Sequence, residues 1–377
     1  MSPSGVPAEP ATARVLRAGA VPLAGRAERP LSLFELWPPA LFYLPVVLCW
    51  IGLALRYRSV TLPTLANPRL EAGGLCGESK AASLSMLGTE GRRLLAPFAT
   101  MVTAPARAAD ADLEAALAAA AARGIGFPLV AKPDIGCRGT GVRIIRGPAE
   151  LRAYLDAFPR GARVMLQRFV PEEGEAGVFY LRRPGEAMGR IVSLTLKYFP
   201  RVTGDGRSTL EELIRADPRA GRIAALYLAR HRDARDRVLA AGESFRLTFL
   251  GNHCRGAVFR DGFRFITPEM TAAFDRIARE IDEFYIGRFD VRFRSLLDLM
   301  RGEGFSIIEF NGVGSEATHI WDRGASLRSA YRAWFAQLAA SFAIGRQNRD
   351  RGFASMRALD LLRLYRKQQR LMRLYPP

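Results

Sequence analysis

The sequence predicts a mixed α+β or α/β fold, and three observations indicate it. With 377 residues, the chain is long enough for a sizeable core and one to three domains. Short stretches that alternate between apolar and polar residues indicate strands, and longer stretches with capping and stop residues indicate helices. Both kinds of stretch are interleaved between residues 100 and 345 without a repeat or a clear linker. We therefore expect one α+β body in this range.

The stretch from Gly287 to Gly314 predicts two strands joined by a short connection. In the first strand, alternation gathers charged residues on one face: Arg288, Asp290, Arg292 and Arg294. In the second strand Glu309 and Asn311 share a face. If the strands pair, two carboxylates and a carboxamide meet beside an arginine, and such oxygen ligands suit Mg²⁺ together with phosphate oxygens. The other interpretation is a half-buried hairpin with a charged face in water.

The charge of the chain is strongly basic, with 55 Lys and Arg against 37 Asp and Glu, a net +18. Nearly all of the basic residues are arginines spread along the chain, so the charge is weak evidence for nucleic acid, and we do not expect a nucleic-acid partner. The chain has four lysines: Lys80, Lys132, Lys197 and Lys367. The four cysteines form no CxxC pair, which favours a reducing cytoplasm.

The N-terminal region predicts a disordered tail over residues 1–30 and an apolar segment over 31–58, followed by a short lead-in region over 59–103. Leu36 to Leu55 carries no charge and is long enough to cross a membrane, whereas Pro38, Pro39 and Pro45 break helical regularity. Two alternatives stay open. The segment is anchored to or lies on a membrane, or it is a buried helical hairpin that packs on the body or on a partner.

The C-terminal region, residues 346–377, predicts a basic amphipathic helix. Its basic residues fall on one side at helical spacing: Arg363, Arg366, Lys367, Arg370 and Arg373. A membrane-surface or partner role and a solvated face packed on the body through leucines are equally compatible with this pattern.

A glycine-rich loop follows the predicted strand that ends in Lys132. The loop contains Gly136, Gly139, Thr140 and Gly141, and its backbone N–H groups could cradle phosphate. It is neither a P-loop nor a dinucleotide fingerprint, because a strand follows it instead of a helix. Lys197 ends another predicted strand. Two of four lysines beside one predicted nucleotide pocket favour phosphate contacts over a role in solubility.

These motifs and their order resemble the ATP-grasp superfamily of carboxylate–amine ligases. The resemblance rests on PLVAKPDIGCRGTGV, VMLQRFV, LKYFPRVTGDGRSTLEELI, GRFDVRF and IIEFNGVGSEATH. It covers roughly Ala104 to Phe342 and implies an ATP-grasp domain over residues 104–345. The closing EFN segment is similar to D-alanine–D-alanine ligases, and VTGDGRSTL is similar to cyanophycin-synthetase-like members. The resemblance implies two α+β lobes that grip ATP.

Carried over by position, the resemblance implies the following sites. ATP phosphates would contact Lys132, Lys197 and the loop, with Lys80 as a further contact. The backbone of Gln167, Arg168, Phe169 and Val170 would read adenine, and Glu175 would bind the ribose. Arg288, with Lys197, would neutralise the transferred phosphoryl group. Asp290, Glu309 and Asn311 would hold Mg²⁺, or Mn²⁺ in its place.

The implied reaction transfers the γ-phosphoryl group of ATP to a carboxylate and lets an amine displace phosphate, so small-molecule substrates are expected. The rivals are phosphoryl transfer to another acceptor and a membrane-associated nucleotide-binding scaffold without turnover. We expect a cytoplasmic protein, with attachment to the inner face of the membrane as the open alternative. The oligomeric state is not predicted.

The chain departs from these ligases in two places. Only about fifty residues separate the apolar segment from the grasp, so part of the usual acceptor site is expected to be replaced. The insert from Arg219 to Phe265 also differs, and in it Arg255 is a candidate for the substrate side. Local signals further predict a capping box of Ser208 and Glu211, a long helix over 219–237 and a hairpin turn at Asp261-Gly262.

Overall fold

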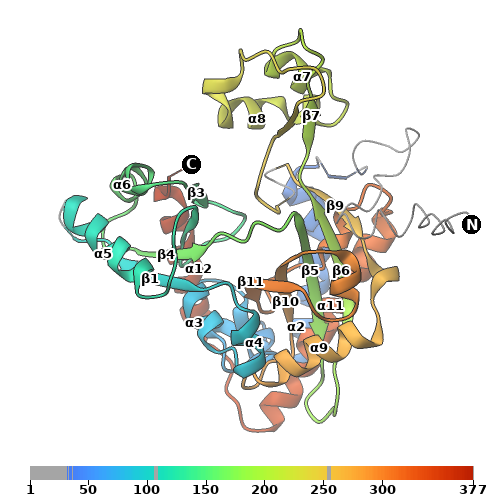
Figure 1. Ribbon diagram of the computed structural model, residues 1–377. Helices are drawn as coiled ribbons and strands as arrows, with labels where there is room; N and C mark the ends of the chain where they lie inside the picture. Colours follow the sequence, from blue (N-terminus) through green and yellow to red (C-terminus); the bar gives the residue numbers. More distant parts are fainter. Residues whose placement is uncertain (1–31, 33, 36, 106–108, 253–255, 377) are drawn as a thin grey trace, which may run out of the picture.

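The computed structural model describes residues 32, 34–35, 37–105, 109–252 and 256–376. In this part of the chain the predicted mixed α/β fold is confirmed, with two lobes built on separate antiparallel sheets (Figure 1). The predicted tail over residues 1–30 lies outside the described residues.

The smaller lobe is a four-stranded sheet covered by two helices. Its strands, in spatial order, are β1 (Phe98–Val102), β4 (Arg163–Arg168), β2 (Leu129–Pro133) and β3 (Arg143–Ile145). Its helices are α5 (Ala109–Ala121) and α6 (Pro148–Asp156). Apolar side chains such as Leu129, Leu151 and Val164 form its core. Because β1 pairs with β4, the lobe starts before residue 104.

The larger lobe is a five-stranded sheet. Its strands, in spatial order, are β11 (Phe305–Asn311), β10 (Ile286–Phe293), β5 (Gly174–Leu181), β6 (Arg190–Tyr198) and β9 (Val258–Asp261). Its shorter segments include α3 (Lys80–Ser85), α4 (Thr89–Leu94), η6 (Phe263–Phe265), α9 (Pro268–Arg279), α10 (Leu296–Met300) and η7 (Thr318–Trp321). The core packs α9 residues such as Phe274 against Phe289 and Phe305 of the sheet. Every residue of the central strand β5 is buried.

A small unit projects from the larger lobe, at the top of Figure 1. It consists of β7 (Arg201–Thr203), α7 (Leu210–Ala216), η3 (Ala220–Ile223), α8 (Ala224–Arg230), η4 (Arg232–Ala234) and β8 (Ser244–Arg246). The predicted long helix over 219–237 is wrong. The backbone leaves helical values at Ile223 and His231, because short turns bend around a core that includes Leu210, Tyr227 and Leu239.

Two further local predictions are wrong. The capping box is formed by Thr209 and Glu212, one residue later than predicted, because Ser208 instead donates its backbone N–H and hydroxyl to Asp205. No hairpin turn forms at Asp261-Gly262. Instead β9 pairs with β6, and the chain enters η6 after Gly262 donates its N–H to the carbonyl oxygen of Leu194.

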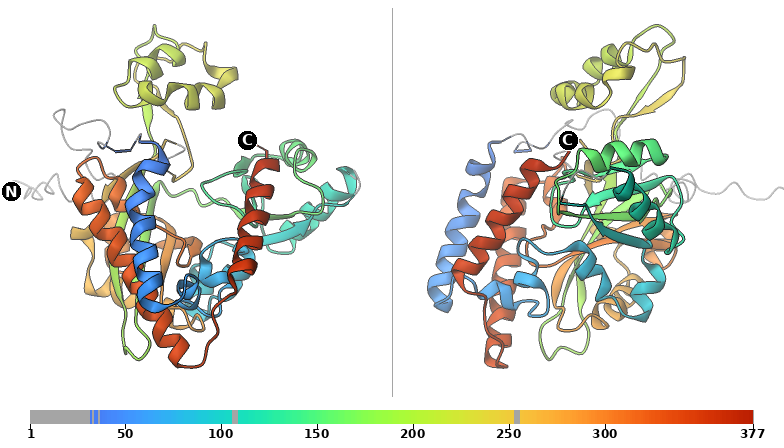
Figure 2. Two further views of the ribbon diagram at one scale, coloured as in Figure 1. Left: turned by 180° about the vertical axis from the view of Figure 1, so that it is seen from behind. Right: turned by 90° about the vertical axis from the view of Figure 1, so that its left-hand side faces the viewer.

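Three long helices lie outside the two sheets, and Figure 2 shows them from two directions. α2 (Pro39–Tyr57) and α11 (Leu327–Asp350) pack on each other at the larger lobe, with η1 (Leu62–Leu65) and η2 (Glu71–Gly74) nearby. α12 (Ala358–Leu374) reaches the smaller lobe, where Leu371 and Met372 pack against its core. The apolar segment is therefore one helix, and the alternative of a helical hairpin is wrong. Phe42 of α2 stacks on Tyr331, and Trp50 meets Phe342 edge to face, both on α11.

Candidate active site

The hairpin β10–β11 brings its predicted site residues face to face, with α10 in the connection. Arg288 lies opposite Asn311, and Asp290 lies opposite Glu309. Residues directly opposite in an antiparallel pair have their Cβ atoms roughly 5 Å apart on one face of the sheet. The two carboxylates are therefore neighbours, as the alternation predicts.

Asp290 is buried and surrounded by donors. Lys197 on β6 donates from Nζ to Oδ1 over 2.7 Å, and Arg288 donates from Nη2 to Oδ2 over 2.9 Å. Asn311 donates from Nδ2 to Oδ2 over 3.4 Å. Burial alone would raise the pKa of Asp290, but Arg288 and Lys197 outweigh it and hold the pKa at about 2. The carboxylate is thus ionised at every physiological pH.

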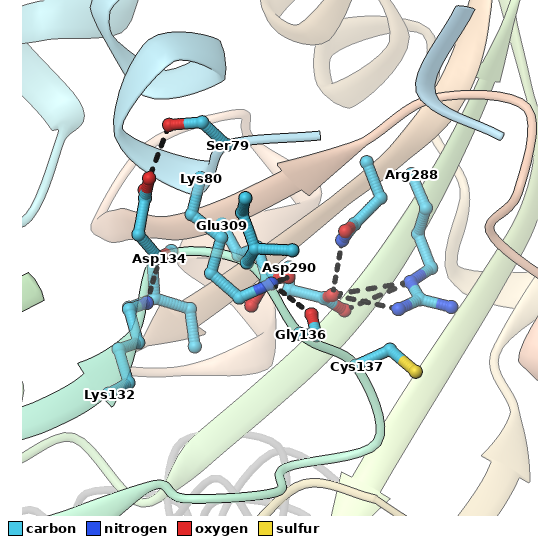
Figure 3. A network of polar contacts seen from close by, with 12 residues as sticks. Ser79, Lys80, Lys132, Asp134, Gly136, Cys137, Arg288, Asp290 and Glu309 are labelled. Carbon is cyan, nitrogen blue, oxygen red and sulfur yellow. Dashed lines mark hydrogen bonds and ion pairs between the residues drawn. The ribbon is translucent and has the colours of Figure 1, made fainter. Parts of the chain in front are cut away.

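Glu309 is paired by Lys80, the first residue of α3 (Figure 3). The Nζ atom of Lys80 lies 3.1 Å from Oε1 of Glu309 and 2.7 Å from the carbonyl oxygen of Gly136. Asp134, which follows β2, positions the lysine: its Oδ1 accepts the hydroxyl of Ser79 and the N–H of Ala81 at the start of α3, each over 2.9 Å. Lys80 thus contacts both Glu309 and the glycine-rich loop.

Lys132 is the last residue but one of β2, close to the predicted strand end, and it is buried. Its Nζ donates to Oε1 of Gln167 over 2.8 Å and to the carbonyl oxygen of Ile308 over 3.2 Å. Burial lowers the pKa of Lys132 to about 8, although Glu309 counteracts part of the shift. An anion bound next to this ammonium group would stabilise its charged form and raise its pKa.

The glycine-rich loop joins β2 to β3, as predicted. Gly139 and Gly141 have φ values of +69° and +71°, a region that favours glycine. A Cβ on Gly141 would also lie 2.7 Å from Cγ of Pro133. The C-terminal region holds this loop, since Tyr375 donates its hydroxyl to the carbonyl oxygen of Ile135 over 2.7 Å. Of the two interpretations of the C-terminal helix, the structure shows packing on the body: Leu371 and Met372 of α12 contact the core of the smaller lobe.

A cavity of about 190 Å³ lies between the lobes and collects most of the predicted ATP-site residues. The predicted residues that line it are Lys80, Lys132, Gly136, Gly139, Thr140, Gln167, Arg168, Phe169, Val170, Glu175, Lys197, Arg288, Asp290 and Glu309. Gly141 and Asn311 are not among its lining residues. The side chain of Gln167 accepts from Lys132 and donates to the carbonyl oxygen of Ala96, so both of its polar atoms are engaged within the protein.

Arg292 is a site residue that the sequence interpretation missed. It is buried, its Nε lies 2.8 Å from Oε2 of Glu175, and its guanidinium lies over the ring of Phe199. Oε1 of Glu175 accepts from Lys197 over 3.0 Å. Alternation along the strand places Arg292 on the same face as Arg288, and this pattern could have identified Arg292 from the sequence. The high arginine content of the chain made a single arginine hard to single out. Arg294, in contrast, is exposed and pairs with Asp298.

The oxygen donors of the hairpin fit Mg²⁺. Among the described residues, no group of three or more His, Cys, Asp and Glu side chains suits a metal ion by itself. If a metal ion binds here, Asp290 and Glu309 would supply two carboxylates, and the carboxamide of Asn311 would supply a third oxygen. Mg²⁺ commonly binds one or two carboxylates and completes its shell with phosphate oxygens and water. The predicted substrate-side residue Arg255 lies outside the described residues.

Comparison of the sequence with curated proteins finds formate-dependent phosphoribosylglycinamide formyltransferases. The protein of Azotobacter vinelandii is 31% identical over 133 residues, 34% of this chain and 33% of its own. That of Dechloromonas aromatica is 35% identical over 106 residues, 27% and 26% of the two chains. No family model matches the sequence. The chain spans about a third of the length of the curated relatives it matches.

The fold comparison finds ligases of known structure at low similarity. The VanG D-Ala:D-Ser ligase of Enterococcus faecalis has 12% identity and a TM-score of 0.40, over 73% of this chain and 64% of its own. D-alanine–D-alanine ligase of Bacillus anthracis has 12% identity and a TM-score of 0.38, over 75% and 72%. The sequence relatives are ATP-grasp enzymes, so the resemblance to this superfamily that the motifs predict is confirmed.

Proposed function

We propose that the protein is an ATP- and Mg²⁺-dependent ligase that joins a carboxylate to an amine through an acylphosphate. One observation carries the proposal: the facing carboxylates of Asp290 and Glu309 are ringed by cations from several separate segments. These cations are Lys80, Lys132, Lys197 and Arg288. Such a cluster has the charges that a nucleotide triphosphate with its metal ion requires, and a charged surface hairpin would not bury them.

The lining of the cavity supports one orientation of the proposed nucleotide. The adenine would lie at the hinge of Phe169 and Val170, just beyond the end of β4, where apolar walls such as Val130 and Ile308 surround it. The phosphates would then extend beneath the glycine-rich loop toward Lys132 and Lys80. Glu175, fixed by Lys197 and Arg292, would face the ribose.

The chemistry requires charge stabilisation more than acid–base catalysis. A substrate carboxylate oxygen bonds to the γ-phosphorus, the bond from the γ-phosphorus to the bridging oxygen breaks, and ADP leaves with the electron pair. When bound by Asp290, Glu309 and Asn311, Mg²⁺ would neutralise phosphate charge. Arg288 would stabilise the transferring group, because its guanidinium is fixed by Asp290 and by the carbonyl oxygen of Glu316 over 3.0 Å.

Hydroxylamine trapping tests this proposal. Purified protein is incubated with Mg·ATP and a panel of amino acids, dipeptides and simple carboxylic acids, and ADP and hydroxamate are measured. The ligase predicts hydroxamate that depends on both ATP and one class of carboxylate. ADP release without hydroxamate would indicate phosphoryl transfer to another acceptor. Neither product, combined with tight ATP binding, would indicate a scaffold.

We also propose that the protein is cytoplasmic and lies on the anionic inner face of a membrane through α2. Among the described residues, α2 is the one helix that is long and apolar enough to cross a membrane. Its exposed stripe consists of Leu41, Leu44, Val47, Leu48, Ile51 and Leu55, each at least 49% exposed. Because the opposite face packs on α11, surface attachment is favoured over a span. Arg56 and Arg58 at the end of the helix complement anionic lipid.

Vesicle flotation tests this attachment. Wild-type protein is expected to float with phosphatidylglycerol vesicles, and the variant Leu44→Glu/Leu48→Glu is expected to stay in solution. If both proteins stay in solution and the wild type alone forms dimers, the stripe is an interface between two copies instead.

A further inference from the structure

A second cavity, of about 350 Å³, adjoins the nucleotide cavity. The two cavities share the walls formed by Lys197, Arg288 and Glu309. Beyond this shared wall the second cavity is lined by segments that are far apart in the sequence. They are the start of α2, the turn before α3, η7 and α12, represented by Tyr43, Glu78, Thr318 and Gln368. The second cavity therefore opens directly onto the place where the transferred phosphoryl group would lie.

The far end of this cavity combines aromatic rings with negative charge. Trp37, Phe42, Tyr43 and Trp321 contribute rings to its lining. Glu316 projects among them, and its oxygens accept from neutral donors, the hydroxyl of Tyr43 and Nε1 of Trp321. These hydrogen bonds fix the carboxylate without neutralising its charge. Aromatic faces next to a fixed carboxylate favour a cationic ligand.

Two polar side chains of the lining, Thr318 and Glu78, also indicate that this cavity binds a ligand. Thr318 is 7% exposed, and its Oγ1 is buried without a hydrogen-bond partner in the described structure. A buried hydroxyl without a partner is costly, and a ligand would satisfy it. Glu78 forms no ion pair with a described residue, and burial raises its pKa against the opposing effect of Lys80. A ligand amine would relieve both groups.

We propose that the second cavity binds the amine substrate, a primary amine attached to an apolar or aromatic group. The proposal rests on the ligase function proposed above and adds the class of the acceptor. Glu78 and Glu316 attract the ammonium group, Thr318 accepts one of its hydrogen atoms, and the rings of Trp37 and Trp321 cover the apolar part. The carboxylate substrate stays at the cationic wall of Arg288 and Lys197.

The bond-forming step balances with these groups. The ammonium gives one proton to the carboxylate of Glu78, and the free amine attacks the carbonyl carbon of the acylphosphate. The C–N bond forms, the bond from this carbon to the phosphate oxygen breaks, and phosphate leaves with the electron pair. The second nitrogen-bound proton goes to the departing phosphate. No oxidant or reductant is needed.

Calorimetric titration tests the cavity directly. Phenethylamine and glycine are titrated into the full chain with Mg²⁺ and a non-hydrolysable ATP analogue. Wild-type protein is expected to bind phenethylamine at least tenfold more tightly than glycine. Thr318→Val and Glu78→Gln are each expected to weaken phenethylamine binding at least fivefold, while the affinity for the ATP analogue changes less than twofold. Glu269→Gln, an exposed carboxylate on α9, is the matched control with wild-type affinities.

Two results would overturn the inference: equal binding of phenethylamine by wild type and both cavity variants, or an equal loss of affinity for the ATP analogue. A trapping experiment separates this failure from failure of the ligase function. If wild type forms hydroxamates but the two variants lower amide and hydroxamate formation equally, the ligase stands and the amine site fails. If no carboxylate gives hydroxamate although phenethylamine binds, the ligase function fails and the cavity stands.

Discussion

The nucleotide cavity and the second cavity share a wall but are built in different ways. The first takes its predicted site residues from strands, from the glycine-rich loop and from Lys80 at the start of α3, and its strand residues Asp290 and Glu309 are in register. Beyond the shared wall, the second cavity takes much of its lining from the start of α2, the turn before α3, the 3₁₀ segment η7 and Gln368 of α12. In the first, carboxylates are paired with cations, whereas in the second Glu316 is held by neutral donors.

This difference indicates a division of labour. In the proposed ATP site the paired charges would form a preorganised environment for the phosphates, and such preorganisation is the main source of electrostatic catalysis. Glu78 and Glu316 form no ion pair with another described residue, and in the proposed amine site they would neutralise the charge of a ligand. The predictions below test this contrast, beginning with the largest expected effect.

Loss of the second carboxylate of the hairpin is expected to stop turnover. Glu309→Gln should lower kcat by about 10²–10³-fold, because a charged group at the transferring phosphoryl is lost. Initial rates of ADP release measure the effect. The control is Glu303→Gln, at the tip of the same hairpin, which should retain wild-type rates. Wild-type rates in Glu309→Gln would contradict the metal assignment.

Replacing a carboxylate that is paired with cations should cost more stability than replacing one that is held by neutral donors. Asp290→Asn should lower the free energy of unfolding by about 3 kcal/mol, because Arg288 is left buried without its anion and Lys197 keeps only Glu175. Glu316→Gln in the second cavity should cost only about 1 kcal/mol, since an amide oxygen still accepts from Tyr43 or Trp321. Urea unfolding followed by circular dichroism measures both. Equal losses of unfolding free energy in the two variants would contradict the difference in charge pairing between the two cavities.

Lys132 should make ATP binding depend on pH. With a pKa of about 8, the lysine is mostly charged at pH 7 and mostly neutral at pH 9, so affinity for ATP should fall about tenfold across this range. The sign follows because phosphate favours the charged form. Lys132→Arg keeps its charge and should give a flat profile by equilibrium binding. A flat wild-type profile would place the phosphates elsewhere.

The hydroxyl of Tyr375 should support the glycine-rich loop. Tyr375→Phe removes one hydrogen bond to Ile135, worth about 1 kcal/mol, and should raise the KM for ATP about fivefold with kcat little changed. Tyr365→Phe, an exposed position on α12, the helix that Tyr375 follows, is the control. Equal KM values for the two variants would mean that α12 does not hold the loop.

The sequence predicts the first cavity far better than the second, for physical reasons. Alternation along β10 and β11 and the position of Lys132 at the end of β2 are local signals, and pairing turns them into contacts. The lining of the second cavity has no such period, because Tyr43 and Glu316 meet only through the packing of α2 on the body. The same limit explains the missed break at His231, where tertiary packing around Tyr227 outweighs helix propensity.

The most direct test of the central claim follows oxygen atoms. A carboxylate that gives hydroxamate is labelled with ¹⁸O in both oxygens and incubated with Mg·ATP and an amine, and the released phosphate is examined by mass spectrometry. Formation and aminolysis of an acylphosphate predict one ¹⁸O atom in each phosphate. Phosphate without ¹⁸O, released together with amide, would contradict the account.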